Sequence, residues 1–260
     1  MKLKSKLLLA LLAISGAAFA DEAAAPADAL AYNIGVASQY RYRGIAQTRG
    51  EPALQGGADF TAATGWYVGT WASTITWISD EGNKAGVSGI KGPVELDLYG
   101  GYRFNVGDVA LDTGFLRYEY ATNNLQDLSG AVNANTNEVY AAATAGVFTF
   151  KYSYSLSNLF GNADSKGSQY FDLSATFDLG EGYSLVPHVG RQDFGNNNGT
   201  SNSGLQYSDY ALTLNKDLGN GLSASAAAIG TNAGQAAYTL NGSNYYQGKS
   251  TLVVGVKYTF

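Results

Sequence analysis

VELDLYGGYRFN, residues Val94–Asn105, alternates between two kinds of side chain. One set of alternate positions carries Val94, Leu96, Leu98, Gly100, Tyr102 and Phe104, and the other carries Glu95, Asp97, Tyr99, Gly101, Arg103 and Asn105. Because successive residues of a strand point to opposite faces, this pattern predicts a β-strand with one apolar, aromatic face and one polar face.

The same period of two recurs to the end of the chain, as in VFTFKYSYSL at residues 147–156. In residues 109–120 the alternation slips near Leu116, which predicts a bulge or a strand end beyond the membrane. Twelve segments are predicted, with approximate cores at Tyr32–Arg43, Ala53–Ala62, Trp66–Ile78, Val94–Asn105, Val109–Tyr120, Asn137–Ala145, Val147–Leu156, Gln169–Asp178, Tyr183–Asp193, Tyr207–Lys216, Leu222–Gly230 and Ser250–Phe260.

Short and long connections alternate between these segments. VGD and DLGNG are short, whereas SDEGNKAGVSGIKGP and ATNNLQDLSGAVNANT are long. This alternation is typical of an up-and-down barrel in a bacterial outer membrane, with short periplasmic turns and long extracellular loops. A β structure spans lipid only as a closed barrel, because every backbone polar group must be paired within the protein. The predicted fold class is therefore an all-β transmembrane barrel of about twelve antiparallel strands.

Residues 1–20 have the parts of a cleaved secretory signal peptide: three lysines, an apolar run over residues 7–14, and Ala18 and Ala20 before the cleavage point. The Ala-rich residues 21–31 are predicted to be a flexible leader, and residues 32–260 to form the barrel. Export and a barrel together predict the outer membrane of a Gram-negative bacterium.

The charge balance excludes nucleic acid as a partner. The 260 residues include 21 acidic and 16 basic side chains, and removing the three leader lysines leaves 13 basic ones. Phosphate binding needs an excess of Lys and Arg. The absence of Cys excludes disulfides and thiolate metal sites; no metal site and no cofactor is predicted.

The last segment, STLVVGVKYTF (residues 250–260), ends in an aromatic residue preceded by alternating apolar ones. It resembles the C-terminal signature by which the barrel-assembly machinery recognises its substrates. Tyr258 and Phe260 are the predicted assembly signal, and outer-membrane lipid is the predicted surrounding.

Several stretches resemble the TorF-like porins, a proteobacterial outer-membrane family. They are GVASQYRYRGIAQT (35–48), PALQGGADF (52–60), GWYVGTWAS (65–73), VELDLYGGYR (94–103), EVYAA (138–142) and YSDYALTLNKDLGNGL (207–222). The resemblance implies a barrel of porin type. It does not imply a solute, because the loop sequences are individual.

Alternation places charged residues of both signs on the inner face. The predicted pore-lining residues are Arg41, Arg43, Asp59, Glu95, Asp97, Arg103, Asp112, Glu138, Lys151, Asp172, Asp209 and Lys257, with Asp178 on the same face. Two interpretations follow: a narrow channel for passive diffusion of small hydrophilic solutes or ions, which we favour, or a salt-bridged, partly plugged structural or adhesive barrel. The acidic excess indicates a mild cation preference.

The outer face is expected to carry aromatic girdles. Trp71, in mid-strand, is expected to face lipid. The predicted girdle residues are Tyr32, Tyr40, Tyr67, Trp77, Tyr102, Phe104, Phe148, Tyr154, Phe177, Tyr183, Tyr258 and Phe260.

Catalysis would have to use His188, the one histidine. Ser184 on the same face is four residues, or ~13 Å, away along the strand, which is too far for proton transfer. A partner from a neighbouring strand stays open as an alternative, in which the barrel is a hydrolase. We predict no catalytic residues and no enzymatic activity.

QYRYRGIAQT, residues 39–48, mixes arginines with tyrosines. If the first strand continues to Arg43, Tyr40 and Tyr42 face lipid while Arg41 and Arg43 face the lumen. Gly44 then releases the strand into the first extracellular connection, and the two arginines lie at the outer mouth.

Overall fold

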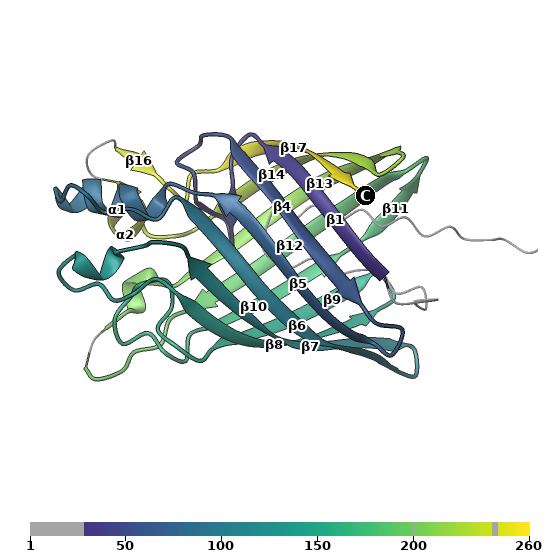
Figure 1. Ribbon diagram of the computed structural model, residues 1–260, viewed down its shortest axis with the longest axis horizontal. Coiled ribbons are helices and arrows are strands. Elements are labelled where there is room, and N and C mark those ends of the chain that lie inside the picture. Colours follow the sequence, from purple (N-terminus) through teal and green to yellow (C-terminus); the bar gives the residue numbers. More distant parts are fainter. Residues whose placement is uncertain (1–28, 200, 241–243) are drawn as a thin grey trace, which may run out of the picture.

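The chain forms a closed antiparallel β-barrel of twelve wall strands (Figure 1). The computed structural model describes residues 29–199, 201–240 and 244–260, so the predicted signal peptide and residues 21–28 of the predicted leader lie outside the described residues. The wall is built from β1 (Ala29–Ala37), β4 (Ala53–Thr61), β5 (Trp66–Thr74), β6 (Val94–Val106), β7 (Val109–Tyr120), β8 (Thr136–Ala145), β9 (Phe148–Ser155), β10 (Gln169–Ala175), β11 (Phe177–Gly180), β12 (Tyr183–Asp193), β13 (Tyr207–Gly219), β14 (Leu222–Thr231) and β17 (Thr251–Thr259).

The ring closes where β1 pairs with β17, and β12 pairs with both β10 and β11. β10 and β11 are two parts of one strand, since both pair with β12 in the same register. That register places Pro187 opposite Ala175, where β10 ends; proline has no N–H to donate to the ladder, which accounts for the interruption.

The two ends of the barrel differ (Figure 1). The short-turn end, where the C-terminus lies, has the connections 62–65, 107–108, 146–147, 181–182 and 220–221. The long-loop end has the connections 38–52, 75–93, 121–135, 156–168, 194–206 and 232–250. These carry α1 (Trp77–Ala85), η1 (Leu125–Asp127), η2 (Ser203–Leu205), α2 (Gln235–Tyr238), β15 (Thr239–Leu240) and β16 (Tyr245–Tyr246). No helix in the described part of the chain is long and apolar enough to cross a membrane.

The predicted alternation of faces holds along the wall strands. In β6, Glu95 and Asp97 are buried inside the barrel while Leu98 is exposed outside. In β17, the exposed outer residues are Leu252, Val254, Val256 and Tyr258. The outer surface is therefore apolar, as a lipid-facing surface requires.

The expected bulge near Leu116 is absent: β7 pairs with β6 in unbroken register from Val109 to Tyr120. Leu116 is buried inside the barrel, and outside it Arg117 donates to Glu119 (Nη2–Oε2 2.5 Å). The alternation continues, but here the inner face is apolar and the outer face is charged. This end of β7 therefore projects beyond the apolar band.

The first predicted strand ends six residues early. β1 stops at Ala37, and the chain turns inward as a small hairpin of β2 (Arg41–Tyr42) and β3 (Ile45–Ala46), with Arg43 (φ 45°) and Gly44 (φ 79°) as its turn. Both turn residues have positive φ, as a type I′ hairpin requires. Gly44 is therefore the tip of an inward fold, and the prediction that it leads outward was wrong.

Three aromatic residues that were predicted to face lipid lie inside the barrel, against the inward hairpin or within it. Tyr40 and Tyr42 are 1% and 7% exposed and belong to an apolar cluster inside the barrel with Leu116 and Tyr118. Trp71 packs edge-on against Tyr40, with ring centroids 5.4 Å apart, so it faces inward.

Two further girdle assignments were wrong. Tyr67 is buried on the inner face of β5. β5 stops at Thr74, and Trp77 begins α1, where it packs against Tyr120 at 5.2 Å. Aromatic residues thus fill the interior as well as ringing the outside.

Candidate functional site

The inner hairpin, residues 38–52, is the central feature of the barrel interior. Its tip, residues 41–46, is closed by a hydrogen bond from Gln47 N to Tyr40 O (2.9 Å). Every residue from Gln39 to Thr48 is buried, although the segment belongs to no wall strand. Its surroundings are therefore the inner faces of the wall strands.

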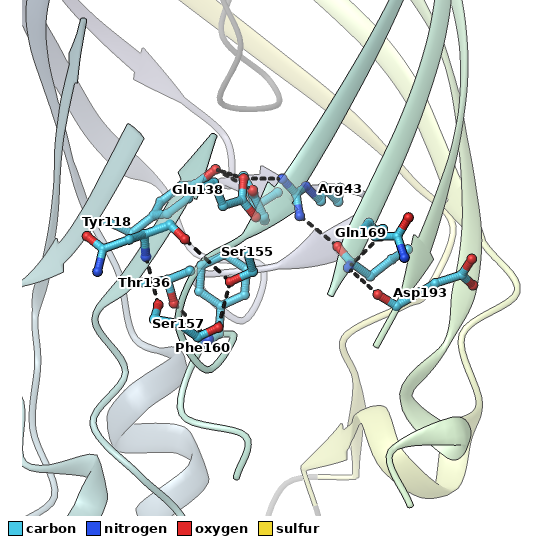
Figure 2. A network of polar contacts seen from close by, with 12 residues as sticks. Arg43, Tyr118, Thr136, Glu138, Ser155, Ser157, Phe160, Gln169 and Asp193 are labelled. Atoms are coloured by element: carbon cyan, nitrogen blue, oxygen red, sulfur yellow. Dashed lines mark hydrogen bonds and ion pairs between the residues drawn. The ribbon is translucent and has the colours of Figure 1, made fainter. Parts of the chain in front are cut away.

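Arg43 joins two sides of the barrel (Figure 2). Its Nη2 donates to Oε2 of Glu138 on β8 at 2.7 Å, and its Nη1 donates to Oε1 of Gln192 on β12 at 2.7 Å. The guanidinium lies over the ring of Tyr170 on β10, 4.2 Å from the centroid, and 4.8 Å from that of Tyr42. Planar, forked donors that also lie against aromatic rings are a contact that lysine does not reproduce.

The two tyrosines of the hairpin bind the inner face of β6 and β7. The Tyr40 hydroxyl donates to Oε1 of Glu95 on β6 at 2.6 Å. The hydroxyls of Tyr42 and Tyr118 on β7 share a hydrogen bond of 2.5 Å. These tyrosines were predicted to face lipid, but they anchor the hairpin to the wall through their hydroxyl groups.

Arg41 braces the tip itself. Its Nη1 donates to Gly44 O (3.0 Å) and to Gln247 O (2.6 Å), and its Nε donates to Gln39 Oε1 (2.8 Å). Arg41 therefore lies inside the barrel, as predicted, but it holds the turn and the last long loop and does not project from a wall strand.

Gly44 lies against the remaining wall. A Cβ added there would be 2.8 Å from Cβ of Asp209 on β13 and 2.7 Å from Cγ2 of Thr231 on β14. With these contacts and a hydrogen bond from Gln39 Nε2 to Thr251 Oγ1 on β17 (3.0 Å), the hairpin touches nine wall strands: β5, β6, β7, β8, β10, β12, β13, β14 and β17. The hairpin consequently crosses the interior from side to side.

The predicted charged residues of the wall lie on its inner face and are largely matched with each other or with tyrosines. Arg103 contacts Asp112 (3.3 Å), which also accepts from the Tyr67 hydroxyl (2.6 Å), and Tyr99 donates to Asp59 (2.5 Å). The Lys151 amine lies 4.1 Å from the centroid of the Tyr140 ring. Lys257 faces inward on β17. Asp178 is exposed on β11, where it accepts from Gly180 N at 2.8 Å.

His188 sits between carboxylates of both neighbouring strands. Nε2 is 3.0 Å from Oδ2 of Asp172 on β10, and Nδ1 is 3.6 Å from Oδ1 of Asp209 on β13. The Tyr170 hydroxyl donates to Asp209 at 3.0 Å. The adjacent sequence contained no sign of these partners, because they come from strands 16 residues before and 21 residues after His188.

Glu95 and Asp97 form the most deeply buried acidic pair, at 1% and 3% exposure. Tyr40 donates to Glu95, whereas no described residue donates to Oδ1 of Asp97. Asp97 stands opposite Tyr118 in the β6–β7 ladder, and the Tyr118 hydroxyl lies 3.4 Å from Glu138. The three carboxylates thus surround the side of the interior that Tyr42 and Arg43 occupy. No group of three or more His, Cys, Asp or Glu placed to hold a metal occurs within the described ranges.

Inner tyrosines and glutamine are the site residues that the sequence-based list omitted. A detectable signal was glycine on the opposing strand: Tyr67 stands opposite Gly101, Tyr99 opposite Gly69 and Tyr140 opposite Gly114. Each tyrosine side chain lies over its glycine, where a Cβ would fall within 2.6 Å of the ring or hydroxyl. No comparable signal marks Gln192, whose role depends on the distant Arg43.

Solved structures of similar fold are porins and channels. The KdgM porin in complex with disordered oligogalacturonate has a TM-score of 0.52 at 8% identity over 89% of this chain and 98% of that chain. NanC porin has 0.52 at 10% identity over 88% and 99%. An outer membrane channel from Pseudomonas putida F1 has 0.50 at 12% identity over 91% and 96%. At these identities the similarity concerns the fold.

Comparison of the sequence identifies one family. No curated protein matches the chain. One family model matches residues 20–260, nearly the whole chain. By this match the chain belongs to the family described as bacterial protein of unknown function (Gcw_chp).

Proposed function

We propose that the protein is a porin-like channel of the Gram-negative outer membrane for passive diffusion of small hydrophilic solutes, closed by its inner hairpin. The observation that carries the proposal is a charged hairpin held by side-chain contacts across the interior of a barrel whose outer face is apolar. Such a tip is tied to the wall by reversible hydrogen bonds and ion pairs, so the same barrel has a closed and an open arrangement.

The leader, the C-terminal aromatic signature and the resemblance to TorF-like porins support the location and the class. The barrel-assembly machinery is the proposed partner during insertion, and small hydrophilic solutes are the proposed cargo. The fold shared with porins and channels adds support for the barrel and leaves the solute to be identified.

Conductance tests the proposal directly. Because Gln47 N already bonds to Tyr40 O, residues 41–46 are replaceable by two glycines without moving the hairpin's base. We call the variant with residues 41–46 replaced by two glycines the tip-replaced protein. In planar bilayers it should show current steps of long duration, and the wild type should show briefer or rarer openings. A correctly folded tip-replaced barrel without conductance would rule out a channel.

A hydrolase is the second candidate, because Ser174 stands opposite His188 in the β10–β12 ladder beside Asp172. The geometry favours charge pairing, since both ring nitrogens face carboxylates and neither is directed to a serine proton. Hydrolysis of lipid or peptide substrates that is lost in both Ser174→Ala and His188→Ala would establish the enzyme instead.

A further inference from the structure

We infer that the wall around Arg43 is a binding site for the guanidinium group of a small cationic solute, and that Arg43 occupies it as a tethered substitute while the hairpin is inside. This deepens the proposed function and rests on it for the role in transport. The wall residues of the site are Glu138, Gln192 and Tyr170, from three different strands.

The site matches a guanidinium in shape as well as in charge. Two different nitrogens of Arg43 reach two acceptors at 2.7 Å each, and the group lies 4.2 Å from the centroid of the Tyr170 ring. Arginine's planar fork combines paired donors with stacking on an aromatic face, whereas an ammonium is a point charge.

Gln192 and Tyr170, two of the three wall residues of the site, are held in place by contacts other than Arg43. Gln192 Nε2 donates to the carbonyl oxygens of Gln169 (3.0 Å) and Asp193 (3.2 Å), so its Oε1 stays directed at Arg43. The Tyr170 hydroxyl is fixed by Asp209 at 3.0 Å. A site with this second layer of support keeps its geometry when the hairpin leaves, which favours rebinding of the same group from solution.

Charge selects a cation for the vacated site. Glu138 lies beside Tyr118, which stands opposite the buried Asp97 in the β6–β7 ladder. No described residue donates to Oδ1 of Asp97. Asp172 and Asp209 lie on the other side around His188. Lys151 on β9 stands opposite Asp172 on β10. Withdrawal of Arg43 therefore leaves Glu138 without the cation that donates to it, and Lys151, which also attracts Glu138, stays on the wall. A buried carboxylate that loses its hydrogen-bonded partner is strongly unfavourable.

A guanidinium solute then competes with Arg43 for the same groups. It stabilises the open arrangement by its differential affinity for it, as any ligand of one of two states does. Neutral or anionic solutes of the same size lack this effect.

Chemical rescue tests the site without transport. Arg43→Gly removes the guanidinium at a left-handed position that glycine accepts readily. Folded barrels migrate faster than unfolded ones in an SDS gel, so heating the sample before electrophoresis gives an unfolding temperature. Methylguanidinium at millimolar concentration should raise this temperature, whereas methylurea should not. The rise should vanish in Arg43→Gly/Glu138→Gln and persist in Arg43→Gly/Glu119→Gln, since Glu119 is an outward carboxylate on the adjacent strand.

Transport is tested on the tip-replaced protein, which also serves if Arg43→Gly does not fold. L-Arginine should reduce its KCl current at a concentration about tenfold or more below that of L-citrulline, which carries a neutral urea in place of the guanidinium. Glu138→Gln in the tip-replaced protein should abolish that difference, and Glu119→Gln should preserve it. Calorimetric titration of both amino acids into the purified barrel reads binding independently of current.

The outcomes separate the two proposals. Conductance with equal responses to arginine and citrulline, or rescue that survives Glu138→Gln, overturns the guanidinium site and leaves the channel. Specific arginine binding without conductance supports the guanidinium site and contradicts the proposal that the protein is a channel. Loss of both discrimination and conductance overturns both.

Discussion

At the residue scale, the Arg43–Glu138 pair is a buried ionic link between the hairpin and the wall. Both side chains are at most 5% exposed, and the two atoms are 2.7 Å apart. A buried pair of this kind contributes little relative to two apolar residues, but removing one partner leaves an uncompensated charge.

Glu138→Gln should therefore lower the free energy of unfolding by about 3 kcal/mol, at the low end for such pairs because Gln still accepts one hydrogen bond. Urea unfolding in detergent measures the change. Arg43→Gln/Glu138→Gln should be less destabilised than the two single variants summed. Strict additivity would show that the pair is not coupled.

Asp80 on α1 offers a pH test outside the wall. Burial raises the pKa of its carboxyl above the usual 3.8, against the opposing effects of Thr76, which donates to it at 2.7 Å, and of Arg49 at 3.6 Å. Between 3.8 and the raised pKa, the folded state holds a proton that the unfolded chain has released, so stability falls as pH rises through this window.

Hydrogen exchange of the α1 amides should accordingly become faster as pH rises through that window, after correction for intrinsic rates. Burial also raises the pKa of Glu81, against the effect of Lys84, so Asp80→Asn should remove part of the dependence and Asp80→Asn/Glu81→Gln nearly all of it. An unchanged profile in the double variant would show that neither carboxyl is responsible.

At the element scale, the β5–β8 wall depends on tyrosines lying across glycines. Tyr67 covers Gly101 and donates to Asp112, which also binds Arg103. A Cβ at Gly101 would lie 2.5 Å from the Tyr67 hydroxyl and closer still to the backbone oxygen of Thr113, so a side chain there would displace this network and strain the β6–β7 pairing. Pairs of this kind support glycine in a strand where it would otherwise weaken the sheet.

Gly101→Val should lower unfolding stability by about 1–3 kcal/mol, as overpacking does. Gly100→Val, one residue away on the outer face, is the matched control and should change stability by much less. Equal effects of the two variants would indicate that the backbone of β6, and not the Tyr67 contact, responds to the substitution. Urea unfolding of both proteins provides the comparison.

At the scale of the whole molecule, the barrel closes where its first and last strands meet. Tyr32 and Phe260 exchange backbone hydrogen bonds of 2.9 Å in both directions, and their rings stack at 5.8 Å. Phe260 also stacks on Tyr258 at 5.7 Å. The terminal aromatic thus has a place in the seam besides the assembly role expected from the sequence.

Deletion of Phe260 should reduce the amount of folded protein in the outer-membrane fraction severalfold, whereas Tyr32→Ala should weaken only the seam. Comparing membrane yield with the unfolding temperature of purified, refolded protein separates assembly from stability. If both variants lowered the two quantities in parallel, Phe260 would act through the seam alone.

The sequence by itself determined the wall. Strand residues alternate in direction whatever surrounds them, so an apolar face against lipid and a polar face inside leave a period-two pattern in each segment, and Val94–Asn105 follows it residue by residue. Loop lengths likewise sorted the two ends of the barrel, because hairpin turns and long excursions leave different numbers of residues between strands.

Only the tertiary structure decided what fills the interior. QYRYRGIAQT continues the alternation of β1, so nothing local distinguishes a strand that stays in the wall from a hairpin that leaves it. The inward course is stabilised by partners remote in sequence: Glu138 is 95 residues from Arg43 and Gln192 is 149 residues away. The same distance hides the partners of Trp71 and His188, since a closed ring brings together inner faces that the chain order keeps apart.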